Sequence, residues 1–237
     1  DSFTTPEFNV NVCQLPFWCL TVYYTWKIHN SKKVELYDCI LLGAVAAFGI
    51  LSKYLFIYLL VAIDLLFAYL IFFKKSKKFD FKYLVSLEVF FVILIPHIIW
   101  LFNNDFITIK YGFARAGLDE GQIMNHLKYP LIFTLKQIGI LIPFLILVWL
   151  LIKKIPKKLN LKDEKLLFLI FINLVPIVLV FMTALITGSK IRTMWMTPFY
   201  LFFGTLFIYL LKDQINIKKL NSFLIGFIFL FLLSPIL

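Results

Sequence analysis

The feature that most constrains this chain is a succession of apolar runs, each long enough to approach the thickness of a lipid bilayer. A helix needs roughly 17–25 mostly apolar residues to cross the hydrocarbon core. Inside the bilayer a backbone must satisfy its own hydrogen bonds, so such runs are expected to be helices. They lack the short alternating pattern of a membrane β-barrel. We predict about eight spans: Val10–Trp26, Tyr37–Leu51, Tyr54–Phe73, Tyr83–Phe102, Leu131–Ile152, Leu166–Thr187, Trp195–Leu211 and Ser222–Leu237.

Composition agrees with an all-α polytopic transmembrane helical bundle surrounded by membrane lipids. The 237 residues are 62% hydrophobic and 19% aromatic, and the mean hydropathy is +0.91. The net charge of +11 would suggest nucleic-acid binding in a soluble protein. Here the lysines cluster in short connections between apolar runs, which the positive-inside rule explains better. Nucleic acid is therefore not an expected partner.

The basic residues are divided unequally between two sets of connections. One set holds 17 of the 24 lysines and arginines, in residues 27–36, 74–82, 153–165 and 212–221. This bias predicts that the lysine-rich connections are cytoplasmic in the inner (plasma) membrane. The outward segments are then residues 1–9, 52–53, 103–130 and 188–194. They mix cations with aromatic, amide and acidic residues, so we expect the active side to face outward.

The cysteines and histidines do not predict a cofactor or a disulfide framework. These residues are Cys13, Cys19, Cys39, His29, His97 and His126. No CxxC pair occurs and the histidines are far apart in the sequence, so the pattern of a metal site is lacking. We expect no cofactor from these residues, although the sequence leaves a metal requirement open.

Four outward cations are candidates for binding a phosphate. Lys53 lies in the tight hairpin "LSKYLF", while Arg115 belongs to the long outward loop. Lys190 and Arg192 stand together in "GSKIRTMW". Arginine can bind phosphate oxygens with two parallel hydrogen bonds, and lysine adds a point charge. The alternative for Lys53 is a turn lysine that extends to the membrane interface. Lys110 and Lys136 are additional cations on this side.

The stretch "IPHIIWLFNNDF" places polar and aromatic residues at the outward end of the fourth run. His97 and Trp100 there are candidates for binding substrate, with Asn103, Asn104 and Asp105 directly after them. Short polar residues suit sugar hydroxyls, but they also commonly form caps and turns. Trp100 can equally be an interface anchor. Tyr111 and Arg115 would share a face if "ITIKYGFARAG" is helical, and an interfacial helix is the form we expect there.

Two acidic residues lie within the apolar runs. Asp64 is in the middle of the third run and Glu88 is in the cytoplasmic half of the fourth. An acid inside a membrane is costly and is a functional candidate by default. We expect Asp64 to be buried and paired, and Glu88 to extend toward the interface.

Four stretches in order resemble a known superfamily. They are "FNVNVCQLPFWCLTVYYTWK" (8–27), "GILSKYLFIYLL" (49–60), "IPHIIWLFNNDFITIKY" (95–111) and "TMWMTPFYLFFGTL" (193–206). Together they resemble bacterial membrane glycosyltransferases related to protein O-mannosyltransferases and the aminoarabinose transferase. These are C-type glycosyltransferases with an RgtA/B/C/D-like domain. The resemblance spans about residues 1–210, with Lys53 at the hairpin lysine and His97 at the helix-end histidine.

The resemblance implies an inverting sugar transfer from a polyprenyl-phosphate donor to a lipid, glycan or protein acceptor outside the cytoplasm. In such enzymes an aspartate in the first outward loop is the general base, and basic residues hold the departing phosphate. That loop has no counterpart here, so the catalytic residue stays unknown. Asp1, Glu7, Asp105, Asp119 and Glu120 are outward acids, but none matches it.

We therefore interpret residues 1–237 as a single transmembrane glycosyltransferase-like domain, cut at both ends and inactive without its base. The chain starts without methionine and stops inside an apolar run. A transporter or flippase for a lipid-linked sugar is the first alternative, since it can use the same cations without a base. It should show an internal repeat and a midplane site. A non-catalytic scaffold is the second, and it predicts that the outward cations do not cluster.

Overall fold

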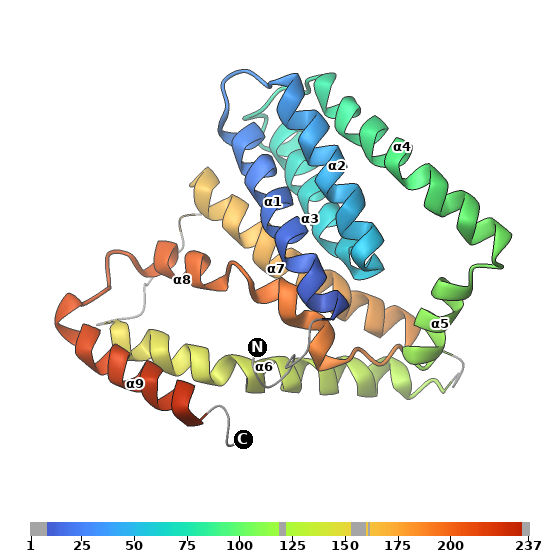
Figure 1. The fold of residues 1–237 in the computed structure, drawn as a ribbon. Helices are drawn as coiled ribbons and strands as arrows, with labels where there is room; N and C mark the ends of the chain where they lie inside the picture. The colour runs from blue at the N-terminus through green and yellow to red at the C-terminus, as the bar shows by residue number, and fades with distance from the viewer. Residues whose placement is uncertain (1–8, 119–121, 153–159, 161, 234–237) are drawn as a thin grey trace.

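The computed structural model describes residues 9–118, 122–152, 160 and 162–233, and within them the chain is helical (Figure 1). The α-helices are α1 (Val10–Asn30), α2 (Leu36–Ser52), α3 (Ile57–Ala68), α4 (Lys82–Asn103), α5 (Ile107–Arg115), α6 (Asn125–Leu151), α7 (Glu164–Thr187), α8 (Phe203–Leu211) and α9 (Leu220–Leu233). Shorter turns of helix are η1 (Tyr54–Phe56), η2 (Tyr69–Phe73), η4 (Thr193–Tyr200) and η5 (Ile217–Lys219). The described residues form no strand, so the predicted all-α fold is confirmed.

The predicted count of eight spans is not confirmed. Four helical stretches are long and apolar enough to cross a membrane: Tyr54–Phe73, Lys82–Asn103, Asn125–Leu151 and Glu164–Thr187. A fifth exists if η4 and α8, which meet at a bend of 50°, form one broken span. The helix α1 has 21 residues but carries polar side chains along its buried face. The helix α2 has 17 residues, and α9 has 14 in the described part.

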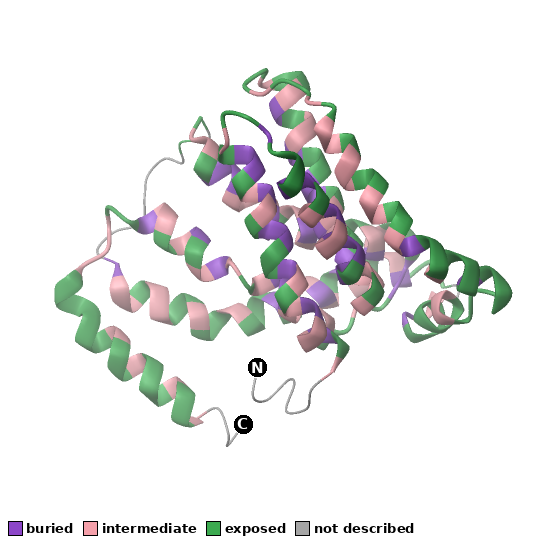
Figure 2. Ribbon diagram, turned by 45° about the horizontal axis from the view of Figure 1, so that its top comes forward, coloured by how far each residue is buried: buried purple, intermediate pink, exposed green. Residues whose placement is uncertain are grey.

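The helices pack as a chain of neighbours rather than as a regular ring. The helix α2 lies between α1 and α4, while α7 packs against α3, α6 and α8. The long helix α6 runs beside α9, away from the α1–α3 group (Figure 1). Buried residues concentrate where α1, α3 and α7 meet, whereas α6 and α9 are largely exposed (Figure 2). Exposed apolar faces of this kind are expected to contact lipid tails.

An aromatic cluster fills the centre of this core. The Trp18 ring of α1 lies 5.5 Å from the Phe56 ring of η1, edge to face, and 4.9 Å from the Phe199 ring of η4. All three side chains are almost fully buried. Contacts of this geometry add to the packing energy of large rings. The cluster ties the start of α3 and the segment after α7 to α1, and these segments carry the cavity described below.

Close packing of α2 on α4 depends on one small residue. A Cβ atom placed on Gly43 would lie 2.3 Å from the carbonyl oxygen of Ser86, so only glycine permits this approach. Small residues are common where membrane helices meet, because they let the backbones come close. Gly43 therefore sets the separation of the two helices.

Three of the lysine-rich connections lie together where their described residues contact one another. The ammonium of Lys27 lies 2.7 Å from the carboxylate of buried Asp38, and that of Lys74 lies 3.2 Å from Glu164. Lys82 also donates a hydrogen bond of 2.6 Å to the carbonyl of Val34. The connections before α2, before α4 and before α7 therefore lie together, as their shared charge pattern predicts.

The expected burial and pairing of Asp64 is wrong for the part of the chain described. The buried face of α3 is formed by Leu59, Ala62, Ile63 and Leu66, which recur at helical spacing. Asp64 lies off this face, its side chain is exposed, and it makes no hydrogen bond or ion pair with the described residues. The carboxyl group therefore points away from the α3–α7 contact.

Candidate functional site

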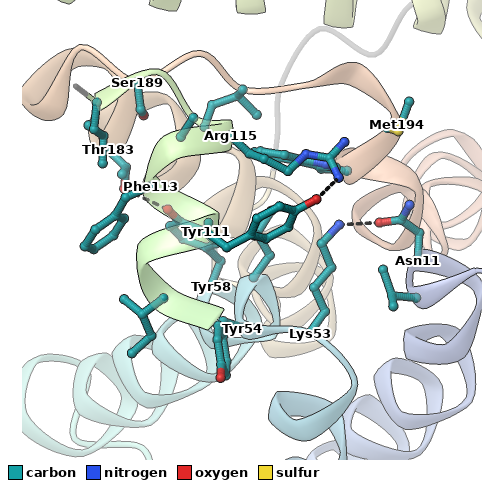
Figure 3. Close-up of a pocket in the computed structure, with 18 of the residues that line it drawn as sticks. Asn11, Lys53, Tyr54, Tyr58, Tyr111, Phe113, Arg115, Thr183, Ser189 and Met194 are labelled. Carbon is teal, nitrogen blue, oxygen red and sulfur yellow. Dashed lines mark hydrogen bonds between the residues drawn. The ribbon is translucent and has the colours of Figure 1, made fainter. Parts of the chain in front are cut away.

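A cavity of about 690 Å³ opens at the end of the molecule opposite the lysine-rich connections (Figure 3). Four segments far apart in the sequence line it: residues 9–11, 53–58, 109–118 and 183–195. They are the start of α1, the α2–α3 hairpin, α5 with the turn after it, and the end of α7 with the segment that follows. All four begin or end at the predicted outward segments, which the fold thus brings together. The volume is in the range of ligand pockets.

Lys53 places its ammonium group inside this cavity. The helix α2 ends at Ser52, whose hydroxyl caps the carbonyl of Gly49, and the chain turns at Lys53 into η1. The ammonium donates a hydrogen bond to the side-chain oxygen of buried Asn11 and lies 5.3 Å from the centre of the Trp195 ring. Burial lowers the pKa of Lys53 to about 8, and the charge of Arg115 contributes to the decrease. In the part of the chain that the structure describes, the ammonium group contacts the neutral side chains of Asn11 and Trp195 and no acid.

Arg115 brings a second cation to the same side of the cavity. The predicted helix is confirmed as α5, and Tyr111 and Arg115 share one of its faces. The guanidinium donates a hydrogen bond of 2.8 Å to the Tyr111 hydroxyl, with its carbon 5.6 Å from the ring centre. Figure 3 shows the head groups of Lys53 and Arg115 close to one another. None of the described lining residues is acidic, so the cavity favours an anion.

Hydroxyl groups lie on the opposite wall, at the end of α7. The hydroxyl of Tyr58 donates to Thr183 at 3.0 Å, and Thr183 donates in turn to the carbonyl of Leu179 at 2.9 Å. Gly188 ends α7 in a left-handed conformation, with φ of 66°, and turns the chain toward the cavity. The next residue, Ser189, is 4% exposed, and its hydroxyl has no hydrogen-bond partner within the described ranges. A buried orphan hydroxyl in a cavity wall is available to a ligand.

His97 lies behind the cavity wall rather than in it. Its Nε2 atom is 2.8 Å from the hydroxyl of Tyr54, which lines the cavity. The same hydroxyl is 2.8 Å from that of Thr108 on α5. The Trp100 ring stacks on the imidazole, with the centroids 5.8 Å apart. His97 and Trp100 therefore contact the candidate site through Tyr54.

The polar residues after α4 form a turn. Asn103 ends the helix, and the Asn104 amide donates a hydrogen bond of 2.8 Å to the carbonyl of Trp100. Asp105 and Phe106 both have positive φ, which turns the chain into α5. None of the three polar residues lines the cavity. Their positions correspond to the cap-and-turn alternative, and their contact with a sugar stays a prediction.

The remaining predicted cations lie outside the cavity. The side chains of Lys190 and Arg192 are exposed, while their neighbours Ser189 and Ile191 line the wall. Lys110 and Lys136 are exposed on α5 and α6 and do not line it either. The structure therefore brings together Lys53, Arg115 and Tyr111 from the predicted set, and leaves these four cations on the surface.

A second, smaller cavity of about 250 Å³ begins where the first ends. Met194 lines both. The smaller cavity runs along α6, η4 and the start of α8, with apolar walls that include Ile140, Phe144 and Phe203. Gly204 also lines it, and a Cβ atom there would meet no atom within 4 Å. The larger cavity thus has cations in its lining, and the smaller cavity on the other side of Met194 is mostly apolar.

Sequence reasoning missed most of the cavity wall, including the polar and aromatic residues Asn11, Tyr54, Ser189 and Trp195. Asn11 had a signal, because α1 repeats polar side chains on one buried face, as Asn11, Gln14, Thr21 and Thr25. Tyr54 follows the predicted lysine directly. Ser189 directly precedes Lys190, and Trp195 follows Arg192 by three residues. In the described ranges, no group of three His, Cys, Asp or Glu side chains is arranged to hold a metal ion.

Comparison with known proteins gives one match. A family model described as dolichyl-phosphate-mannose-protein mannosyltransferase matches residues 2–100, which is less than half of the chain. The matched region includes Asn11, Lys53, Tyr54 and His97, but ends before Arg115. No curated protein and no solved structure matched. Residues 2–100 are therefore similar to a family of membrane glycosyltransferases, named for a lipid-linked mannose and a protein acceptor.

Proposed function

We propose that this chain forms the donor-binding part of a glycosyltransferase that uses a sugar linked to polyprenyl phosphate. The sugar would pass to a lipid, glycan or protein acceptor on the outward face of the inner (plasma) membrane. The observation that carries the proposal is the pairing of Lys53 and Arg115 in a cavity whose described lining contains no acid. The family match supports it independently, because it includes the Lys53 hairpin.

The two cations suit a phosphate that becomes a leaving group. When the sugar departs, negative charge develops on the lipid phosphate, and cations placed beside the phosphate stabilise that charge. Lys53 is held by the neutral oxygen of Asn11 and not by a carboxylate. Among the described residues, no acid neutralises this charge before the phosphate arrives. Arg115 adds a planar group that can bind two phosphate oxygens at once.

The rest of an amphiphilic donor fits the surroundings of the cations. A sugar presents hydroxyl groups, and the Ser189 hydroxyl on the facing wall has no hydrogen-bond partner among the described residues. A polyprenyl tail needs an apolar path, which the smaller cavity offers beyond Met194. The proposal thus assigns the phosphate to Lys53 and Arg115, the sugar to the α7 end, and the tail to the α6–η4 side.

The position of the cavity favours chemistry at the membrane surface over transport. Its walls come from helix ends and from the turns between helices. A transporter site is expected near the midplane, between broken helices of repeated halves. The general base of the reaction is not assigned to any described residue. Its role is to remove the proton of the acceptor hydroxyl as the new bond forms.

Sugar transfer in membranes tests the proposal. Membranes from cells that produce the whole protein would receive radiolabelled polyprenyl-phosphate sugars, and labelled product would be measured for wild type, Lys53→Ala and Arg115→Ala. We expect transfer by wild type and its loss in both variants at equal expression. Lys136→Ala, which removes an exposed cation outside the cavity, is the matched control and should retain transfer. Labelled lipid protected inside vesicles without any transfer would instead establish the flippase.

A further inference from the structure

The helix α5 carries part of the cavity wall yet is weakly embedded in the protein. None of its residues from Ile107 to Arg115 is buried. It nevertheless supplies Tyr111 and Arg115 to the cavity. Core packing does not hold a helix without buried side chains in place. The position of Arg115 therefore depends on the few contacts that attach α5 to the rest of the molecule.

Hydrogen bonds attach α5 near both ends. At the end of the helix, the backbone N–H of Lys190 donates to the carbonyl of Ala116 at 2.7 Å. Near its start, the Thr108 hydroxyl lies 2.8 Å from that of Tyr54. Thr108 and Arg115 are seven residues apart, which is about two helical turns. The attachment at Thr108 therefore fixes the direction of the helix that bears the guanidinium.

The Tyr54 hydroxyl is itself held in place by His97. Nε2 of His97 lies 2.8 Å from it, and the stacked Trp100 ring restricts the imidazole. A tyrosine hydroxyl carries one proton, so it donates to one of its two partners and accepts from the other. Removing the imidazole leaves this hydroxyl with one partner and frees it to turn away from Thr108. Tyr54 also directly follows Lys53 in the chain, so it adjoins one cation in sequence and contacts the helix that bears the other.

We infer that His97 is a positioning residue, which acts through the Tyr54 hydroxyl and Thr108 to hold α5 and to set the place of Arg115 relative to Lys53. It lines no cavity itself. The inference rests on the proposed function only where it concerns the phosphate ligand. The attachment of α5 is a property of the protein alone and can be measured without a ligand.

Limited trypsin digestion of the purified protein measures the attachment directly. Trypsin cleaves after Arg115, and cleavage after Lys78 at the other end of the molecule is an internal reference. His97→Phe, Tyr54→Phe and Thr108→Val should each speed cleavage after Arg115 by about 2- to 10-fold, the equilibrium effect of one hydrogen bond. His97→Gln, which retains a hydrogen-bonding side chain, should lie nearer to wild type. Unchanged cleavage in all three variants would overturn the inference.

Tyr58→Phe is the matched control for this experiment. It also removes a tyrosine–threonine hydrogen bond in the same cavity, but the Tyr58 hydroxyl reaches Thr183 on α7 and not α5. Cleavage after Arg115 should therefore stay at the wild-type rate. Thr108 lies on an exposed helix, so Thr108→Val keeps the test decisive if a change at His97 disturbs folding. Acceleration by Tyr58→Phe as large as by Tyr54→Phe would contradict the inference.

Binding of a polyprenyl phosphate shows whether the attachment of α5 contributes to phosphate binding by Lys53 and Arg115. We expect His97→Phe to weaken binding in the wild-type background and to have little additional effect once Arg115 is replaced by alanine. Tyr58→Phe and Arg115→Ala should instead combine additively, as independent changes do. Additive effects of His97→Phe and Arg115→Ala would overturn the positioning role. No binding by wild type would overturn the proposed function, and the digestion result would still decide the attachment of α5.

Discussion

The ammonium group of Lys53 donates a hydrogen bond to the side-chain oxygen of Asn11, which precedes it by 42 residues. This bond joins the start of α1 to the α2–α3 hairpin at the mouth of the cavity. Asn11 is almost fully buried, so its amide has a fixed position. The bond holds the lysine in the cavity, where no described acid pairs with it, and the protonation of this lysine leads to the first prediction.

Binding of a polyprenyl phosphodiester should weaken as the pH rises above about 8, the pKa of Lys53 in the free protein. A bound anion favours the protonated lysine, so the pKa is higher in the complex than in the free protein. Between these two values binding takes up a proton, and affinity falls by about tenfold per pH unit. Below pH 8 the affinity should be nearly constant. Titration calorimetry at several pH values measures this profile.

Lys53→Arg is the control for this pH dependence. A guanidinium stays protonated throughout the alkaline range, so the variant should bind with an affinity that does not change between pH 7 and 10. The phosphodiester ligand keeps one negative charge across the same range and adds no titration of its own. A pH profile in the variant as steep as in wild type would assign the titration to another group.

Gly204→Leu should weaken the binding of a long-chain polyprenyl phosphate by about 2- to 5-fold, because the new side chain fills the smaller cavity. The expected effect is small because the tail otherwise lies in lipid and gains only packing from the protein. A short-chain analogue should bind equally well to both proteins. Gly139→Leu, whose added side chain also meets open space but lies outside both cavities, is the control. Equal loss for short and long chains would contradict a tail site.

Gly43→Ala should lower the free energy of unfolding by about 1–3 kcal/mol, the usual effect of overpacking. The added methyl would meet the Ser86 carbonyl, so α2 and α4 must separate. Gly139→Ala provides the comparison, because no atom stands in its way and alanine stabilises a helix by up to about 1 kcal/mol relative to glycine. Thermal unfolding in detergent compares the two variants. A Gly43→Ala protein as stable as Gly139→Ala would show that α2 and α4 do not pack this closely.

Trp195 should report the arrival of the phosphate. The Lys53 ammonium lies 5.3 Å from the centre of its ring, and a phosphate would draw that charge away from the indole. Tryptophan emission should therefore change on titration with a polyprenyl phosphate. The change should disappear in Trp195→Phe and persist in Trp149→Phe, since Trp149 is exposed on α6 outside both cavities. A ligand-dependent change that survives in Trp195→Phe would assign the signal elsewhere.

Local patterns in the sequence predicted those parts of the fold and site that depend on neighbouring residues. The helical spacing of Tyr111 and Arg115 led to the helix that the structure has as α5. The Lys53 hairpin was predictable because two apolar runs meet there with almost no connection. The span count was less accurate, since α1 is long but polar on its buried face. The mean hydropathy of the whole run does not reveal that its buried face is polar.

Contacts between distant segments could not be predicted in this way. The bond from Lys53 to Asn11 and the contacts of Tyr54 with His97 and Thr108 each join segments more than 40 residues apart. Nothing in local spacing indicates which helix ends will meet. For the same reason, Lys190 and Arg192 were plausible candidates, although the backbone at this point turns Ser189 and Ile191 toward the cavity instead.

The four segments that line the cavity also have an order in time. A membrane protein is synthesised from its N-terminus, so Asn11 and Lys53 enter the membrane long before Ser189 and Trp195 are made. The cavity cannot close until α6 and α7 have been inserted and the residues after them have returned to α1. During synthesis, Lys53 is therefore in the membrane before Trp195 has been made. The site is assembled only near the end of translation of the described helices.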